Sequence, residues 1–449
     1  MNETIAALAT PPGRGAIAIV RCSGPEARAI AARVFRSREP LRDRAAVYGE
    51  ILDLDGAVID RGLALAMDAP RTATGEDVVE LHVHGSPVVA RETLRALFRA
   101  GARPAQPGEF TRRAFLNGKL DLSAAEAVAD MIDAETRAGA RAAAANLAGA
   151  LRDAVGGARA GLGAILEELA GSIDYPDEVP EPPRSGVAAT VAAIDGQLAE
   201  LERDWERGRL VREGMALAIV GPPNAGKSSL LNGLLGEERA IVSEIAGTTR
   251  DVIEERVVVD GVAVRIVDTA GLRASDDRLE RIGIGRAEQA LAGAALALVV
   301  VDGSRPLDDD ARAILERTRA RPRIVLFNKA DLGRAAFETR DVRDADALSG
   351  SAHAAETVAA VRAAIGAAAL GGEAPDPGRP HLASARQAAA VARGRDALAQ
   401  ARATLDRGDP LDLVAPDLVA AVAALGEITG AAATEAILDG VFARFCIGK

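Results

Sequence analysis

The stretch Met215-Ala-Leu-Ala-Ile-Val220, followed by Gly221-Pro-Pro-Asn-Ala-Gly-Lys-Ser228, decides the fold of the middle of the chain. Six apolar residues predict a buried strand, and Ser229–Leu235 continues with a helical pattern. A glycine loop between a strand and a helix lets backbone N–H groups surround phosphates at the helix N-terminus. Lys227 can then reach the β- and γ-phosphates, and the hydroxyl of Ser228 can ligate Mg²⁺. The sequence therefore predicts a P-loop nucleotide-binding domain.

Two further motifs follow in the order expected of such a domain. Asp268-Thr-Ala-Gly271 comes after a predicted strand, where the carboxylate can hold the metal through water and Gly271 can sense the γ-phosphate. Asn328-Lys-Ala-Asp331 comes after another predicted strand. Asp331 can accept hydrogen bonds from the ring N–H and the amine of guanine, whereas adenine offers neither donor in that arrangement. The predicted nucleotide is GTP, and Leu348-Ser-Gly-Ser351 fits a base-contact loop and a plain surface loop equally well.

The loop Gly247-Thr-Thr-Arg-Asp251 has the composition of a first switch, which can close on the γ-phosphate through Thr249 and Mg²⁺. Leu272 stands where small signalling GTPases place the glutamine that orients the attacking water. Another residue must then position the water, and Glu280 in an acidic stretch is the candidate. From the residues alone, a solvated helix position for Glu280 is the favoured interpretation.

The balance of charged residues limits the class of protein. The formal charge of −11 over 449 residues argues against a broad basic surface for nucleic acid. Only four of the 54 basic residues are lysines, at positions 119, 227, 329 and 449. A compact ammonium cannot be mimicked by guanidinium in a tight pocket, so these lysines are candidate site residues, although chance could have retained any one of them.

The chain is predicted to be a multidomain cytoplasmic protein. Its N-terminus shows no secretory pattern, no apolar run is long enough for a membrane span, and Cys22 and Cys446 match no zinc spacing. Residues 1–118 alternate short β-rich and amphipathic runs and predict an α/β domain. Residues 119–212 and 371–449 have helical patterns, so the nucleotide domain at 213–370 is predicted to interrupt one helical domain.

Short motifs in every part of the chain then point to one family. They are Ala9-Thr-Pro-Pro-Gly-Arg-Gly15, Thr74-Gly-Glu-Asp-Val-Val-Glu80, Pro107-Gly-Glu-Phe110, Arg113-Ala-Phe-Leu-Asn-Gly-Lys-Leu-Asp121, Gly247–Asp251 and the terminal Phe445-Cys-Ile-Gly-Lys449. Together they resemble the MnmE (TrmE) family of bacterial tRNA-modification GTPases. Prenylation is the competing interpretation of a cysteine four residues from the end, but a terminal lysine matches that signal poorly.

The resemblance implies an N-terminal tetrahydrofolate-binding-like domain that mediates homodimerisation, a helical domain and an inserted Ras-like G domain. It places folate contacts on Arg21, Glu80, Lys119 and Lys449. Residues alone would favour an ordinary outward-facing carboxylate for Glu80. Cys446 is implied as catalytic, with a structural or exposed thiol as an equally acceptable interpretation.

The resemblance also implies how hydrolysis is organised. A potassium ion, bound by Asn224, Ser243, Ile245 and Thr248, takes the place of an arginine finger when two G domains meet. The resemblance implies that Ser228 and Thr249 ligate Mg²⁺ and that Glu280, Arg250 and Asp251 are catalytic. Arg273 belongs to a switch. The implied GTP-binding residues are Asn224, Ala225, Gly226, Lys227, Ser228, Ser229, Ser243, Glu244, Ile245, Ala246, Gly247, Thr248, Thr249, Asp268, Thr269, Ala270, Gly271, Asn328, Lys329, Ala330, Asp331, Ser349, Gly350 and Ser351.

The function implied by the resemblance is a GTPase of tRNA wobble-uridine modification. With the FAD- and NADH-using partner MnmG (GidA), in a heterotetramer or larger complex, it would add a carboxymethylaminomethyl or aminomethyl group at C5 of that uridine. The one-carbon unit would come from 5,10-methylenetetrahydrofolate, for which 5-formyltetrahydrofolate is an analogue. Two alternatives remain at this point: a ribosome-assembly GTPase that binds rRNA, which normally carries a basic module, and a pure dimerisation switch.

Overall fold

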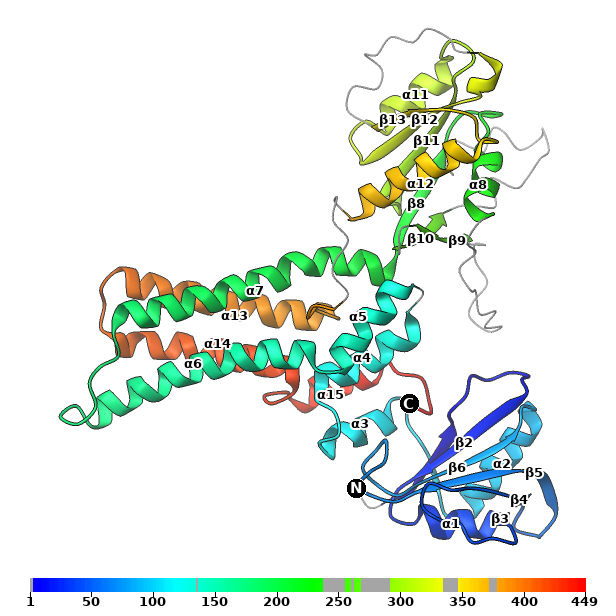
Figure 1. Cartoon of the computed structure of the whole chain (residues 1–449), viewed down its shortest axis with the longest axis vertical. Coiled ribbons are helices and arrows are strands. Elements are labelled where there is room, and N and C mark those ends of the chain that lie inside the picture. Colours follow the sequence, from blue (N-terminus) through cyan, green and yellow to red (C-terminus); the bar gives the residue numbers. More distant parts are fainter. Residues whose placement is uncertain are drawn as a thin grey trace. The chain divides into compact units, whose positions relative to one another are not determined.

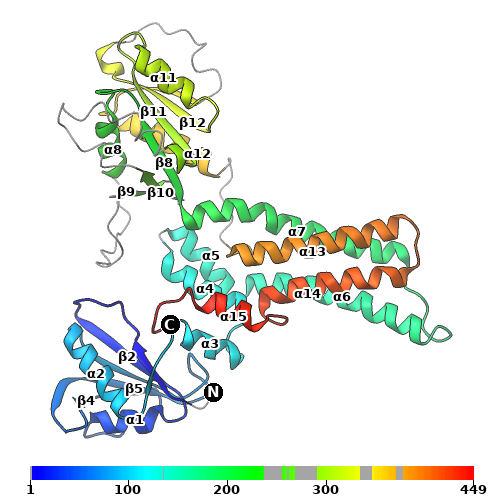
Figure 2. The same cartoon turned by 180° about the vertical axis from the view of Figure 1, so that it is seen from behind.

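The computed structural model describes residues 3–134, 136–236, 255–259, 262–267, 291–333, 346–370 and 378–449, without the side chains of 206–213, 255–256, 346 and 370. Figures 1 and 2 show the chain from opposite sides, and it divides into two compact units. The first unit comprises residues 1–129, 146–195 and 389–449, and the second comprises 130–145 and 196–388. Within the described residues, no helix is both long enough and apolar enough to cross a membrane.

The N-terminal part of the first unit is a seven-stranded sheet in the order β3-β4-β5-β6-β2-β1-β7. Neighbouring strands pair antiparallel, except β1 with β7. The strands are β1 (Ile5–Leu8), β2 (Ile17–Ser23), β3 (Phe35–Arg36), β4 (Ala46–Leu52), β5 (Val58–Met67), β6 (Val78–His84) and β7 (Arg103–Pro104). Helices α1 (Ala27–Val34) and α2 (Pro87–Arg99) contact each other and the sheet, and they share one apolar core with it (Figure 1).

The alternation of the sequence in this sheet explains why only one face is covered. Along β4, Val47 and Ile51 belong to the core, whereas Tyr48 is 66% exposed. The register sets Tyr48 opposite Leu63 of β5, and Leu63 opposite His82 of β6, so these side chains share one face of the sheet. The N-terminal sheet therefore has a helix-covered face and a second face on which apolar and charged side chains reach solvent.

The rest of the first unit is helical. Its elements, some of which continue into the second unit, are α3 (Glu109–Leu116), α4 (Leu122–Asp133), α5 (Arg137–Leu147), α6 (Ala150–Asp174), α7 (Arg184–Glu213), α13 (Ala385–Asp406), η4 (Leu411–Val414), α14 (Ala415–Thr429) and α15 (Glu435–Phe442). Helix α6 packs along α14, and its buried residues recur every three or four positions, which makes one apolar stripe. Asp195 of α7 pairs with Arg395 and Arg402 of α13, so segments from both sides of the nucleotide-binding region pack together.

The second unit contains a six-stranded sheet in the order β13-β12-β11-β8-β10-β9, in which only β9 runs antiparallel to its neighbour. The strands are β8 (Met215–Val220), β9 (Glu255–Val259), β10 (Val262–Val267), β11 (Leu296–Asp302), β12 (Arg323–Asn328) and β13 (Asp346–Ser349). The described helices of this region are α8 (Lys227–Leu235), α11 (Asp309–Arg317), η2 (Ala330–Leu332) and α12 (Ala355–Leu370).

Both faces of this second sheet are buried, which accounts for its uninterrupted apolar strands. Leu217 and Ile219 of β8 pack into one core with residues of α8 and α12, whereas Ala218 and Val220 pack into another with α11. Parallel sheets with helices on both faces favour such strands. The fold class predicted from the sequence, an α/β and helical multidomain protein with a Ras-like G domain, is confirmed.

The domain limits at residues 118, 212 and 370 stay predictions. The two compact units do not test them, because the first unit groups the N-terminal sheet with most of the helical part.

Candidate functional sites

The phosphate loop joins the end of β8 to the start of α8. Two of its residues have left-handed backbones, Asn224 with φ of 59° and Gly226 with φ of 98°. The ammonium of Lys227 donates to the carbonyls of Gly221 at 2.9 Å and Pro222 at 2.7 Å. The loop therefore brings a cation and the first amides of α8 to one place, which is the arrangement that binds phosphate.

Asn328, at the end of β12, connects the phosphate loop to a second loop. Its Nδ2 donates to the carbonyl of Ala225 at 2.8 Å, and its Oδ1 accepts from the amide of Ala352 at 2.7 Å. The side chain is buried, and a Cβ on Gly226 would lie 2.0 Å from its Nδ2. Gly226 is thus required both by its φ and by the close approach of Asn328.

The segment after Asn328 meets the loop that the sequence suggests for base contact. The amide of Ala330 donates to the carbonyl of Gly350 at 3.1 Å, and the amide of Gly350 donates to Phe327 at 3.0 Å. A Cβ on Gly350 would lie 2.1 Å from Oγ1 of Thr357, so a glycine is needed here as well. Asp331 is exposed beside this junction, with its carboxylate available to a ligand. The structure thereby brings Asn328–Asp331 and Ser349–Ser351 together.

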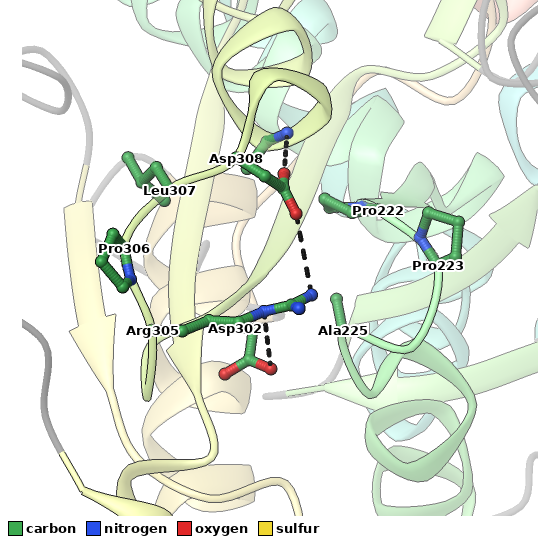
Figure 3. A pocket seen from close by; sticks show the side chains of 9 residues that line it. Pro222, Pro223, Ala225, Asp302, Arg305, Pro306, Leu307 and Asp308 are labelled. Carbon is green, nitrogen blue, oxygen red and sulfur yellow. Dashed lines mark hydrogen bonds and ion pairs between the residues drawn. The ribbon is translucent and has the colours of Figure 1, made fainter.

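Sequence reasoning missed Asp302, which ends β11 and contacts Lys329. Nζ of Lys329 lies 2.8 Å from Oδ2 of Asp302. Burial raises the pKa of Asp302, but hydrogen bonds from Lys329 and Ser304 outweigh it and lower the pKa to about 2. Asp302 also lines a small pocket with Pro222, Pro223 and Arg305, so it lies next to the phosphate loop (Figure 3). The only signal in the sequence was an acidic residue at the end of a buried strand.

Most of the predicted switch residues lie outside the described residues. This applies to the three positions implied to be catalytic in GTP hydrolysis and to most of the implied K⁺ and Mg²⁺ ligands. The residues concerned are Ser243, Glu244, Ile245, Ala246, Gly247, Thr248, Thr249, Arg250, Asp251, Asp268, Thr269, Ala270, Gly271, Leu272, Arg273 and Glu280.

A second cluster lies on the less covered face of the N-terminal sheet. Arg21 of β2 and Glu80 of β6 are direct cross-strand partners, and their side chains form an ion pair at 2.8 Å. The Arg21 guanidinium also lies 5.8 Å from the centre of the Phe110 ring, and His82 approaches the other Glu80 oxygen at 3.3 Å. A guanidinium held between a carboxylate and an aromatic ring is ordered in advance for a planar anion.

The C-terminal tail reaches the same place. The amide of Phe110 donates to the main-chain oxygen of Lys449 at 3.2 Å, and the amide of Gly108 donates to Cys446 at 3.5 Å. Gly448 has φ of 100°, and a Cβ there would lie 2.0 Å from the carbonyl of Leu8. Arg21, which pairs with Glu80, and the main-chain oxygen of Lys449 thus both lie beside Phe110, and Cys446 is exposed in the same C-terminal tail.

Lys119 has a different setting from the other predicted folate residues. Its exposed ammonium donates to the carbonyl of Pro70 at 3.1 Å, and its stem lies close to Gly75. This places Lys119 beside the loop that leads into β6, the strand that carries Glu80. The contact leaves the ammonium accessible to an anion.

A buried ion network underlies this cluster, and sequence reasoning missed it too. Arg113, only 1% exposed, pairs with Glu76 and with Glu109 at 2.9 Å each. Glu109 also pairs with Arg103 at 2.7 Å. Burial raises the pKa of Glu109, but hydrogen bonds from Arg103, the Gln106 amide and Arg113 bring the pKa down from 4.5 to about 2. The network fixes α3, which carries Phe110.

Comparison with known proteins covers the whole chain. Residues 4–119 match the family described as "GTP-binding protein TrmE N-terminus", and residues 122–446 match the "MnmE helical domain". A protein of Symbiobacterium thermophilum, named "tRNA modification GTPase MnmE", is 47% identical over 459 residues, and one of Chloroflexus aurantiacus with the same name is 46% identical over 468 residues. In both cases the alignment spans 100% of each chain.

Proposed function

This chain belongs to the MnmE family of tRNA modification GTPases, and from that premise we propose which of its residues bind the nucleotide and a folate. The protein is a GTP hydrolase that acts in tRNA modification. Its similarity over the full length to tRNA modification GTPases gives no support to the rRNA-binding alternative. Asn328 is the observation that supports this most, because its two hydrogen bonds tie the phosphate loop to the loop beside Asp331.

For the nucleotide, the proposal assigns phosphate binding to the start of α8 and to Lys227. The Lys227 ammonium now donates to two loop carbonyls, and phosphate oxygens would take their place as stronger, charged acceptors. Ser228 would hold Mg²⁺, and the exposed carboxylate of Asp331 would read guanine. The remaining described residues of the predicted set, including Ser349–Ser351, line the two loops that Asn328 connects.

The residues proposed for hydrolysis are those that the family resemblance implies. K⁺, bound with the help of Asn224 when two G domains meet, would supply positive charge where other GTPases use an arginine. Asn224 lies in the phosphate loop with a left-handed backbone, which asparagine adopts more readily than most residues, and its K⁺ role is proposed from the family resemblance. Glu280 would position the attacking water, while Thr249, Arg250 and Asp251 would act in the first switch.

The hydrolysis assignments can be tested separately from binding. Glu280→Ala should leave GTP affinity near normal and abolish most turnover. Replacing K⁺ with Na⁺ should suppress both G-domain association and hydrolysis. Unchanged turnover in Glu280→Ala would remove Glu280 from the mechanism, and indifference to Na⁺ would remove the K⁺ role from Asn224.

For the one-carbon unit, the proposal assigns tetrahydrofolate to the cluster around Phe110. Arg21 and the ammonium groups of Lys119 and Lys449 suit the anionic part of a folate, and Glu80 suits the N–H edge of a pterin. The folate would supply the carbon that the homodimer, together with MnmG and its FAD and NADH, adds at C5 of the wobble uridine. Cys446 remains a candidate catalytic residue in that step, since its thiol is exposed in the C-terminal tail that reaches the cluster.

The decisive experiment is calorimetric titration of the full chain with 5-formyltetrahydrofolate. Lys119→Ala should lose most of the binding without unfolding, because the Lys119 ammonium is exposed and its hydrogen bond goes to the carbonyl of Pro70 in a loop. Arg95→Ala is the matched control, since Arg95 is an exposed cation on α2. No binding by the parent chain would withdraw the folate assignment and leave the GTPase assignment intact.

A further inference from the structure

Asp302 makes four hydrogen-bond or ion-pair contacts, two through each of its carboxylate oxygens. Its Oδ1 accepts from the backbone amide of Ser304 at 3.0 Å and from the Ser304 hydroxyl at 2.6 Å. Its Oδ2 faces two cations, the Lys329 ammonium at 2.8 Å and Nε of Arg305 at 3.4 Å. Oδ1 therefore binds the backbone and hydroxyl of Ser304, and these contacts fix the direction in which Oδ2 points toward the two cations.

Lys329 is the residue on which this arrangement acts. Its backbone is left-handed, with φ of 66°, and it lies between Asn328 and Ala330, both of which are fixed by hydrogen bonds to the loop at Gly350–Ala352. The backbone is thus set by its neighbours, while the long side chain depends on its end contact for a single conformation. Asp302 supplies that contact and is only 11% exposed.

The same carboxylate lies beside the phosphate loop. Asp302 and Arg305 line one small pocket with Pro222, Pro223 and Ala225, and Figure 3 shows the Arg305 side chain reaching across between Asp302 and Asp308. Arg305 approaches Asp308 at 3.7 Å, so it is shared between two carboxylates. Asp302 therefore sits between the loop for phosphate and the lysine of the base-reading segment.

We propose that Asp302 is a positioning residue for guanine-nucleotide binding, which acts by holding the Lys329 side chain ordered before the nucleotide arrives. The inference rests on the nucleotide site proposed above, but it adds a residue that no motif contains. An unrestrained lysine loses most of its rotamer freedom when it is ordered, and a charge-assisted hydrogen bond made in advance removes that cost from binding. The effect should be the same for GDP and GTP, because Lys329 belongs to the base side of the site.

Asp302→Asn tests the contacts that Oδ2 makes with Lys329 and Arg305. The amide oxygen can stay toward Ser304 and keep both of its hydrogen bonds, but the amide nitrogen then points two donors at Lys329 and Arg305. Full-length protein carrying Asp302→Asn should bind GDP and GTP about tenfold more weakly, the size expected for one charge-assisted contact. The turnover number at saturating GTP should stay at the parent value, whereas the melting temperature of the nucleotide-free protein should fall somewhat, because the ion pair with Lys329 is lost.

Two further variants make the test specific. Asp308→Asn removes the same charge from the same pocket, and asparagine retains the helix-capping hydrogen bond that Asp308 accepts from Ala311, so affinity should be unchanged. Lys329→Met should weaken binding, and adding Asp302→Asn to it should weaken binding no further, because the contact is already gone.

Each outcome separates this inference from the site itself. If Asp302→Asn weakens binding as much on the Lys329→Met background as on the parent, or only lowers the melting temperature, the positioning role is overturned. The same holds if Lys329→Met weakens binding and Asp302→Asn alone does not. If Lys329→Met itself binds nucleotide normally, the assignment of Lys329 to the nucleotide site fails, and the inference fails with it.

Discussion

The two sheets of the molecule place their polar groups in opposite ways. In the parallel sheet, they follow the carboxyl ends of neighbouring strands: the phosphate loop after β8, Asp302 at the end of β11, Asn328 at the end of β12 and Ser349 at the end of β13. This edge is where open α/β sheets bind ligands. In the antiparallel sheet, Arg21 and Glu80 stand within their strands, on the face that the helices α1 and α2 leave open.

The two arrangements also differ in what holds them. The loops of the nucleotide site depend on neutral hydrogen bonds of Asn328 and on glycines at positions where a Cβ would collide, such as Gly226 and Gly350. The N-terminal cluster depends on ion pairs, with Arg113 buried between two carboxylates. Steric constraint in one sheet and charge compensation in the other should respond differently to substitution and to acid.

The largest effect is expected for Arg113→Met. This change leaves Glu76 and Glu109 without their buried partner, and breaking such a pair costs about 3–5 kcal/mol of unfolding free energy. Hydrogen exchange should show faster opening of β2 and β6, while β8 and β11 exchange at the parent rate. Arg95→Met, an exposed change on α2, should alter neither sheet. Equal loosening of both sheets by Arg113→Met would contradict the idea that this network serves the N-terminal sheet alone.

A smaller effect, confined to the other sheet, is expected for Gly226→Ala. The new Cβ would lie 2.0 Å from Nδ2 of Asn328, at a φ of 98° that alanine rarely adopts. The strain should cost about 2 kcal/mol and move Asn328 away from Ala225, so nucleotide affinity should fall by at least tenfold. Fluorescent-nucleotide binding measures the loss. Gly293→Ala is the control, because Gly293 has nothing within 4 Å of such a Cβ; equal losses in both variants would argue against steric constraint.

The grouping of the predicted nucleotide motifs at one edge was predictable, because each motif is a short run placed directly after an apolar strand, and parallel strands bring those ends together. The contact between Lys329 and Asp302 was not, because it joins residues 27 positions apart through the order of two strands. No local pattern states that order.

The N-terminal cluster was predictable only through the family resemblance. Arg21 and Glu80 are 59 positions apart, and their pairing depends on the register between β2 and β6. The buried network is harder still, since Arg113 and Glu76 are 37 positions apart, although Glu109 and Arg113 have the spacing of an ion pair within a helix. Arginine and glutamate in an amphipathic segment are more often exposed, and only the packed structure shows that these are not.

The smallest predicted effect concerns acid. The folded pKa of Glu109, about 2, lies below its ordinary 4.5, so the ion pairs contribute stability that is fully present above pH 4.5 and is lost as the pH falls toward 2. Glu109→Gln should therefore reduce the amount by which the unfolding free energy of the N-terminal sheet falls between these pH values. The reduction should be on the order of 1 kcal/mol, after allowance for solvent screening.

Amide hydrogen exchange measures this loss in β2 and β6. The rates at pH 5 and at pH 3 are compared after correction for the intrinsic pH dependence of exchange. The β8 and β11 amides in the same samples serve as the internal reference. Glu92→Gln, an exposed carboxylate on α2, provides the matched variant and should keep the parent slope. A parent-like slope in Glu109→Gln would mean that Arg103 and Arg113 stabilise the sheet through packing of their stems rather than through charge, and the contrast between the two sheets would then lie in topology alone.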